Sequence, residues 1–264
     1  MTTVGRVLLR SVAWAVLGYL VLPLVVLVGA SMTRSRFLAF PPDGVTLAWY
    51  GQVLDDPSYV SAFVTSTAIA ASATVAAVLL AVPAALALAR YSFFGRTAIS
   101  ALFLSPLLLP YIVLGAALLQ YGAALGLARS FTALLIGHVV IVTPFVLRSV
   151  LPQLNLGQRA LEEASMDLGA GPAATFFLIT LPLIRSGLVS GSLLAFISSW
   201  INVELSIFNT TAELTTIPVK LFNYVQYSVD PTIAAVSAVT ILVAAAVITA
   251  LDLTIGLEIL ATRR

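Results

Sequence analysis

The sequence predicts an all-α polytopic membrane protein with six transmembrane helices. Its 264 residues are 60% hydrophobic, only 9% are charged, and the mean hydropathy is +1.08. A soluble domain has about a quarter of its residues charged, so we expect lipid to solvate most of this surface. A membrane-spanning helix needs roughly 20 apolar residues, and the chain has room for six such helices with their connections.

The first apolar run follows Arg6 and Arg10 and is longer than the apolar region of a signal peptide, which has about 7–15 residues. We interpret it as an uncleaved span; a signal peptide that ends near Ala30 is the alternative. Proline inside a span is tolerated where neighbouring helices satisfy the freed backbone groups. The predicted spans are residues 12–30, 59–89, 97–121, 131–150, 186–208 and 231–253.

Three parts of the chain are predicted. Residues 1–58 form an N-terminal span and an external amphipathic segment, in which Trp49 and Tyr50 suit the membrane interface because aromatic side chains favour that depth. Residues 59–258 form the transmembrane domain, which includes a loop over residues 159–187. Residues 259–264 form a tail in the cytoplasm.

The basic residues predict that both termini lie in the cytoplasm. Cytoplasmic loops carry an excess of lysine and arginine, and this orientation places nine basic residues inside and four outside. The nine are Arg6, Arg10, Arg90, Arg96, Arg148, Arg159, Arg185, Arg263 and Arg264; the four are Arg34, Arg36, Arg129 and Lys220.

The 159–187 loop is the most polar stretch between two spans. Residues 160–168 predict a short helix whose apolar face is set by a spacing of i, i+3, i+4 and i+7. Gly169 and Gly171 break this helix, Pro172 suits the start of a second helix, and Leu181-Pro182 is expected to end that helix. Two interpretations remain open from these properties: a docking surface, or a loop helix packed on its own spans.

The loop also resembles the EAA signature of binding-protein-dependent ABC importer permeases. Glu163-Ala164 is followed by Gly169 and then by Leu181-Pro182, with Ser165 at a position that is often alanine. The segments 47–50 and 217–231 are similar to the spermidine/putrescine-type branch. The resemblance covers residue 47 to the end and implies the type I ABC importer permease fold with cytoplasmic coupling helices.

The resemblance implies a permease subunit of an ATP-driven importer in the bacterial inner membrane. Its implied partners are an ABC ATPase dimer, a second related permease subunit, a solute-binding protein and the lipid bilayer, with no nucleic acid. A small solute, with a polyamine or similar cation favoured, would pass by alternating access; aminoethylphosphonate, ferric iron and thiamine are alternatives. The residues implied to dock the ATPase are Leu161, Glu162, Glu163, Ala164, Asp167, Leu168, Gly169, Leu181 and Pro182.

Two polar residues are candidates for the permeation path. The polyamine branch usually has an aspartate after the fifth-span phenylalanine, whereas this chain has Asn202 and then Glu204. A buried charge in a membrane is costly and usually lines a cavity or pairs, so we predict that Asn202 and Glu204 line the path. The alternatives for Glu204 are a carboxylate at the outer interface or a partner for Lys220.

No catalytic site, metal site or cofactor of its own is expected for this chain. It has no cysteine and a single histidine, His138, which we interpret as a packing residue rather than a proton relay. It lacks the Gly-x-x-x-x-Gly-Lys-Ser/Thr loop that cradles ATP phosphates, so ATP and magnesium belong to a separate ATPase. A self-sufficient secondary transporter and an intramembrane enzyme are the competing classes.

Two glycine pairs have a spacing that favours close helix approach. Gly122 and Gly126 fall at a tight connection and predict a turn. Gly187 and Gly191 begin the fifth span and are candidates for packing against a partner subunit.

Overall fold

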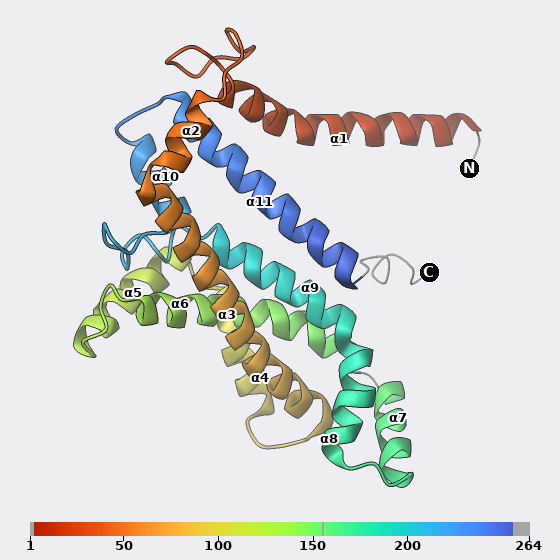
Figure 1. The fold of residues 1–264 in the computed structure, drawn as a ribbon. Coiled ribbons are helices and arrows are strands. Elements are labelled where there is room, and N and C mark those ends of the chain that lie inside the picture. The colour runs from red at the N-terminus through yellow and green to blue at the C-terminus, as the bar shows by residue number, and fades with distance from the viewer. Residues whose placement is uncertain (1–2, 155, 256–264) are drawn as a thin grey trace. The chain divides into compact units, whose positions relative to one another are not determined.

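The computed structural model describes residues 3–154 and 156–255, and helices make up most of them. No strand is assigned in these ranges, which confirms the all-α prediction. The elements are α1 (Thr3–Ser31), α2 (Ala48–Asp55), α3 (Pro57–Arg90), α4 (Arg96–Leu104), η1 (Ser105–Leu107), α5 (Tyr111–Ala124), α6 (Phe131–Val150), η2 (Leu151–Gln153), α7 (Leu156–Asp167), α8 (Pro172–Thr175), the π-helical turn η3 (Phe176–Thr180), α9 (Leu181–Trp200), α10 (Ile217–Val225) and α11 (Pro231–Ile255) (Figure 1).

Four helical segments of the described chain are long and apolar enough to cross a membrane. A fifth is added if α4 with η1 and α5 count as one bent span, and Pro231–Ala246 is a shorter apolar helix. The four long segments are Gly5–Ser31, Pro57–Arg90, Phe131–Gln153 and Pro172–Trp200.

Contacts divide the chain into two compact units. Unit 1 holds residues 1–60 and 221–247, and unit 2 holds residues 61–220 and 248–264. The cytoplasmic tail predicted at residues 259–264 lies outside the described residues.

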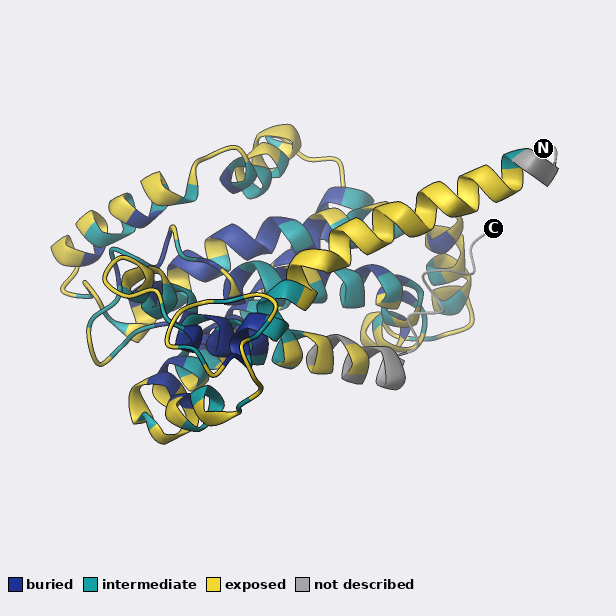
Figure 2. Cartoon of the chain, turned by 90° about the horizontal axis from the view of Figure 1, so that it is seen from above, coloured by how far each residue is buried: buried dark blue, intermediate teal, exposed yellow. Residues whose placement is uncertain are grey.

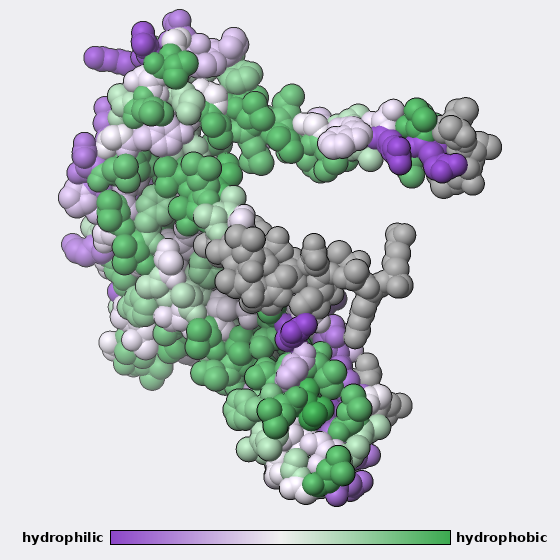
Figure 3. Space-filling model, turned by 45° about the vertical axis from the view of Figure 1, so that its right-hand side comes forward, coloured by the Kyte–Doolittle hydropathy of each residue, from purple (hydrophilic) through white to green (hydrophobic). Residues whose placement is uncertain are grey.

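In unit 1, α1 is exposed along nearly its whole length (Figure 2). Its surface is hydrophobic, and hydrophilic residues gather near its N-terminal end (Figure 3). The segment after α1 is tied to α2 by two hydrogen bonds. Trp49 Nε1 donates to the Thr33 carbonyl at 2.8 Å, and the hydroxyls of Ser31 and Tyr50 lie 2.6 Å apart. The predicted interfacial aromatic residues therefore hold the turn between α1 and α2.

In unit 2, small residues allow close packing of the long helices. Ala73, Ala77, Ala81 and Ala85 recur every four residues on α3 and are fully buried, so they form one continuous seam along this helix. The core around this seam is completed by aliphatic residues of α6 and α9.

Glycine allows α6 and α9 to approach each other closely in unit 2. A Cβ atom added to Gly187 would lie 2.3 Å from the Ser149 carbonyl oxygen, and one added to Gly191 would lie 2.9 Å from Val146 Cα. The two glycines thus serve packing inside the chain, which corrects the expectation that they face a partner subunit. Gly126 has φ +70° in the turn after α5, as predicted, whereas Gly122 lies inside α5 and is buried.

Two predicted spans differ from the structure. The third is not one straight helix, because the chain bends by 103° between α4 with η1 and α5. Pro110 precedes α5 in extended conformation, and its missing N–H removes one bond of a continuous helix. The fifth span ends at Trp200 rather than near residue 208, and turns follow it.

Candidate functional site

A helical hairpin forms the predicted loop. Its first arm, α7, ends where Gly169 adopts φ +91°, a conformation that suits glycine. The Ala170 N–H donates to the Ser165 carbonyl at 3.1 Å, and the Gly169 N–H donates to the Met166 carbonyl at 2.9 Å. This pair of bonds is the Schellman motif. Pro172 then occupies the first turn of α8, where its missing N–H costs nothing.

The second arm of the hairpin continues without a break into α9. The helical segment from Pro172 to Trp200 runs through α8, η3 and α9, so the expectation that Leu181-Pro182 ends the second helix is wrong. A proline inside an α-helix clashes with the carbonyl four residues earlier, here that of Leu178. The π-helical turn at Phe176–Thr180 widens the helix at this point and accommodates Pro182.

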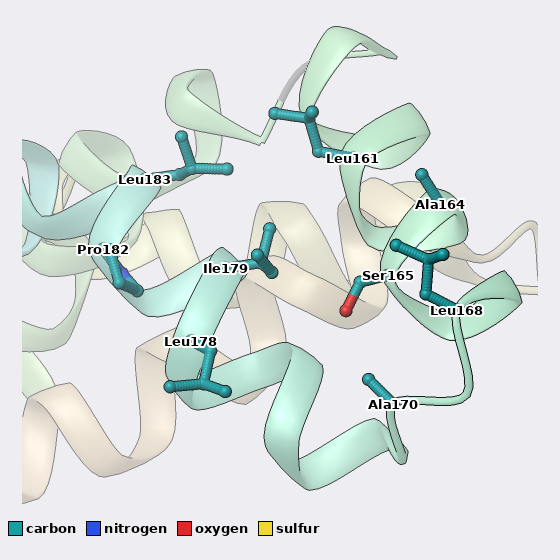
Figure 4. Close-up of a pocket in the computed structure, with 9 residues that line it drawn as sticks. All are labelled: Leu161, Ala164, Ser165, Leu168, Ala170, Leu178, Ile179, Pro182 and Leu183. Carbon is teal, nitrogen blue, oxygen red and sulfur yellow. The ribbon is translucent and has the colours of Figure 1, made fainter.

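An apolar groove of about 480 Å³ runs between the two arms (Figure 4). Side chains of α7 face those of η3 and the start of α9 across it. Leu168 is 90% exposed and Leu178 is 72% exposed, so the groove contains large aliphatic side chains with no cover within the described chain. The lining residues are Leu161, Ala164, Ser165, Leu168, Ala170, Leu178, Ile179, Pro182 and Leu183.

The two neighbouring glutamates of α7 point in different directions. Glu163 is 56% exposed at its side chain and pairs, within the described residues, with Arg159 one turn earlier at 2.9 Å. Glu162 is 12% exposed, and its Oε1 accepts from Arg90 Nη2 at 2.9 Å and from Thr180 Oγ1 at 2.8 Å. Helical geometry separates consecutive side chains by about 100°, so one carboxylate faces the protein and the other faces solvent.

The predicted docking residues fall into three groups. One group lines the groove: Leu161, Ala164, Leu168 and Pro182. A second group is exposed and does not line the groove: Glu163, Asp167 and Gly169. The third is turned toward the protein: Glu162 bonds inside the chain, and Leu181 packs against the hydrophobic core.

The two predicted permeation residues differ in surroundings. Asn202 is 7% exposed, and its Oδ1 accepts from the Leu205 N–H at 2.9 Å, so its side chain stabilises the turn that follows α9. Glu204 lies in this same turn and is exposed. The structure thus separates a buried turn residue from an exposed carboxylate two positions later.

His138 has a partner at each ring nitrogen. Nδ1 lies 2.7 Å from Ser199 Oγ, and Nε2 lies 3.0 Å from Ser206 Oγ. The residue is 1% exposed and joins α6 to the end of α9 and to the turns beyond. These contacts confirm the interpretation as a satisfied packing histidine. The described residues contain no group of three or more His, Asp or Glu placed to hold a metal ion.

Sequence comparison finds transport proteins over most of the chain. The putrescine transport system permease protein PotI of Escherichia coli (strain K12) is 34% identical over 226 residues, which cover 83% of this chain and 80% of PotI. The spermidine/putrescine transport system permease protein PotC of Haemophilus influenzae is 29% identical over 245 residues, which cover 92% of this chain and 95% of PotC. The chain belongs to the ABC importer permeases. It falls in their spermidine/putrescine-type branch, as the segments 47–50 and 217–231 predict.

Solved structures agree with this assignment at the level of the fold. A bacterial ABC transporter involved in the import of the acidic polysaccharide alginate superposes with a TM-score of 0.69 at 17% identity, covering 94% of this permease and 98% of that chain. An amino acid ABC transporter solved with histidines superposes with a TM-score of 0.57 over 80% of the permease. No family model matches the chain. The importer permease is thereby favoured over a self-sufficient secondary transporter.

Proposed function

We propose that the permease works in the bacterial inner membrane as one of two related permease subunits that bind an ATPase dimer and receive solute from a binding protein. The observation that carries this proposal is the exposed apolar groove of the hairpin. The lack of a phosphate-binding loop supports hydrolysis of ATP by a separate chain. Bound ATP and magnesium would stay on that chain.

Six spans are the membrane topology that we propose. Four long helices, the bent pair of α4 and α5, and α11 together supply six apolar crossings. An even number returns both termini to one side, and the excess of arginine in the segments on that side favours the cytoplasm. The hairpin then lies in the cytoplasm, where an ATPase can reach it.

The groove is suited to a partner that inserts an apolar side chain and presents a basic group. Monomeric soluble surfaces rarely expose large contiguous apolar patches, and the core of an interface is usually apolar with a polar rim. Leu161 and Leu168 supply the apolar centre, and Glu163 and Asp167 are exposed on other sides of the same helix. An ATPase surface with an apolar side chain for the groove, and with arginine or lysine that reaches around α7, would match both.

Co-purification of the permease with its ATPase tests the docking proposal. We expect Leu161→Asp and Leu168→Asp each to lower the amount of ATPase recovered at least about tenfold, because hot-spot truncations cost about 2 kcal/mol or more. Met166→Ser is the matched control, since Met166 lies on α7, is 45% exposed and does not line the groove. Full ATPase recovery with both aspartate variants would refute docking through this groove.

The hairpin arrangement also suggests how ATP would drive transport. Because the second arm is continuous with α9, a displacement of the hairpin reaches the membrane through an unbroken helical segment. Closing of the ATPase dimer would move the hairpin, and the spans would alternate between outward-open and inward-open arrangements. Binding energy can shift such an equilibrium only by differential contact with the two states.

A polyamine or a similar small cation is the solute that we propose. The relatives PotI and PotC are named for putrescine and spermidine, and exposed Glu204 is the one acidic residue in the turn that follows α9. A carboxylate beside the path of a cation lowers the cost of removing water from it. We expect Glu204→Gln to lower uptake of putrescine, measured with the radiolabelled solute in vesicles.

The control for the cargo proposal is Glu213→Gln, because Glu213 is also exposed and lies in the segment between α9 and α10. Calorimetric titration of the cognate binding protein with putrescine and spermidine identifies the solute independently. Unchanged uptake in Glu204→Gln would remove Glu204 from the path, and failure of the binding protein to bind either polyamine would refute the cargo.

A further inference from the structure

A partly buried ion pair fastens the hairpin to a different helix. Arg90 is the last residue of α3, and Glu162 lies on α7, 72 positions later in the sequence. Both side chains are 12% exposed, and Arg90 Nη2 lies 2.9 Å from Glu162 Oε1. Such a pair is screened by salt much less than an exposed one.

The same carboxylate oxygen also reaches the second arm of the hairpin. Thr180 Oγ1 donates to Glu162 Oε1 at 2.8 Å. Thr180 is the last residue of the π-helical turn and is 4% exposed. One oxygen atom therefore joins three elements: the end of α3, the middle of α7 and the end of η3, which continues into α9.

The covalent chain alone does not provide this connection. Rotation or translation of the hairpin reaches α9 directly, because α8, η3 and α9 form one helical segment. No such continuity links α7 to α3, since α4, α5 and α6 lie between them in the sequence. Any movement that α3 shares with the hairpin must pass through side-chain contacts.

We propose that Glu162 is a positioning residue that clamps the hairpin to the end of α3, so that a displacement imposed on the hairpin moves α3 and α9 together. This inference rests on the proposed function. Glu163 then contacts the ATPase, whereas Glu162 passes the movement into the membrane. We name Arg90, Glu162 and Thr180 the clamp.

The clamp is suited to this role by its geometry and its surroundings. A charge-assisted hydrogen bond is short and directional, and breaking a buried pair by removing one partner leaves an uncompensated charge. The three groups therefore keep one arrangement while the elements that carry them move as a body. Loss of the carboxylate charge would let α7 move without α3.

The test uses the complete transporter reconstituted in vesicles, with the ATPase, the companion permease and the binding protein. Glu162→Gln keeps the shape of the side chain and removes its charge. We expect this variant to retain ATPase binding in co-purification and to transport about tenfold less solute per ATP hydrolysed, since a loss of one charge-assisted bond is worth at least that factor.

Four further variants separate coupling from folding. Arg90→Gln is expected to reproduce the loss of coupling, and the double variant with Glu162→Gln is expected to be no worse than either single change. Arg90→Lys keeps the charge and should restore part of the coupling. Glu163→Gln should instead weaken ATPase binding, because that carboxylate faces solvent.

A distance measurement tests the clamp without transport. The chain has no cysteine, so two introduced cysteines carry the only spin labels. Tyr91 and Met166 are 68% and 45% exposed and lie beside Arg90 and on α7 respectively. We expect one narrow distance between these labels with and without ATP in the otherwise wild-type transporter, and a broad distribution in Glu162→Gln.

The outcomes are distinct. Wild-type coupling in Glu162→Gln, or a label distance that changes with ATP in the wild type, overturns the clamp. Parallel loss of ATPase binding and uptake in Glu162→Gln also overturns it, because the residue would then only support folding or docking. If the wild-type permease does not bind the ATPase at all, the proposed function itself fails.

Discussion

Replacement of Gly187 by alanine should separate α6 from α9. The added Cβ would lie 2.3 Å from the Ser149 carbonyl oxygen and 2.9 Å from Gln153 Cγ. Because ordinary contacts between heavy atoms are about 3.5 Å, the two helices must move apart by roughly 1 Å at this point. The backbone oxygen cannot rotate away as a flexible side chain would.

The expected loss of stability follows from the contacts that the interface between α6 and α9 would lose. Each pair of heavy atoms in contact gains about 0.1–0.2 kcal/mol of van der Waals attraction, and a gap of about 1 Å removes a quarter to a half of it. For about 40 atom pairs across the interface between α6 and α9, the free energy of unfolding falls by about 1–4 kcal/mol. This range agrees with the roughly 1–3 kcal/mol typical of overpacked cores. For a chain of this length, a loss of about 2 kcal/mol corresponds to a fall in Tm of about 4–8 °C.

Thermal unfolding of the purified permease in detergent, followed by tryptophan fluorescence, measures this effect. Gly18→Ala is the matched control, since Gly18 also lies in a long apolar helix but has no atom within 4 Å of an added Cβ. Gly191→Ala should fall between the two, because its Cβ would lie 2.9 Å from Val146 Cα. A Tm for Gly187→Ala equal to that of Gly18→Ala would refute the packing argument.

Two further predictions concern polar contacts. Replacing His138 by leucine leaves the hydroxyls of Ser199 and Ser206 without this partner and should lower the free energy of unfolding by about 1–3 kcal/mol. Replacing both serines by alanine in the leucine variant should recover most of this loss. If stability does not recover, the loss comes from packing and not from the hydrogen bonds. Burial, and then the hydrogen bond and charge of Asp230, raise the pKa of Tyr224. A neutral phenol is therefore favoured in the folded state, so the stability difference between wild type and Tyr224→Phe should be constant at neutral pH and disappear only as the pH rises through that raised pKa.

The apolar runs predicted where the long helices lie, because membrane spans are set mainly by local hydropathy. They did not predict where α9 ends. Residues 201–208 are largely apolar, and hydropathy does not distinguish a buried turn from a helix. The turn forms because Asn202 Oδ1 accepts the Leu205 N–H and Asn209 Nδ2 donates to the Gly115 carbonyl at 2.9 Å. The second contact joins residues 94 positions apart, so no local pattern contains it.

The hairpin could be predicted because the residues that end its first helix and start its second lie next to each other in the sequence. A positive φ favours Gly169, and the first turn of a helix tolerates Pro172, so the break between the arms follows from residue types alone. The continuation through Pro182 could not be predicted in this way. A proline in a helical pattern usually marks an end or a kink, and only the π-helical turn before it keeps the segment continuous.

The different burial of the two neighbouring glutamates could not be predicted from the sequence. Glu162 and Glu163 have the same chemistry and sit on the same polar stretch, so both were predicted to dock the ATPase. The structure gives them side-chain exposures of 12% and 56%, because Arg90 approaches one of them from α3. An exposed pair such as Arg159 and Glu163 is worth at most about 1 kcal/mol, so Glu163 can exchange Arg159 for a group on the ATPase at little cost. Glu162 cannot make the same exchange without giving up its contacts with Arg90 and Thr180, and we therefore expect its replacement to affect coupling more than docking.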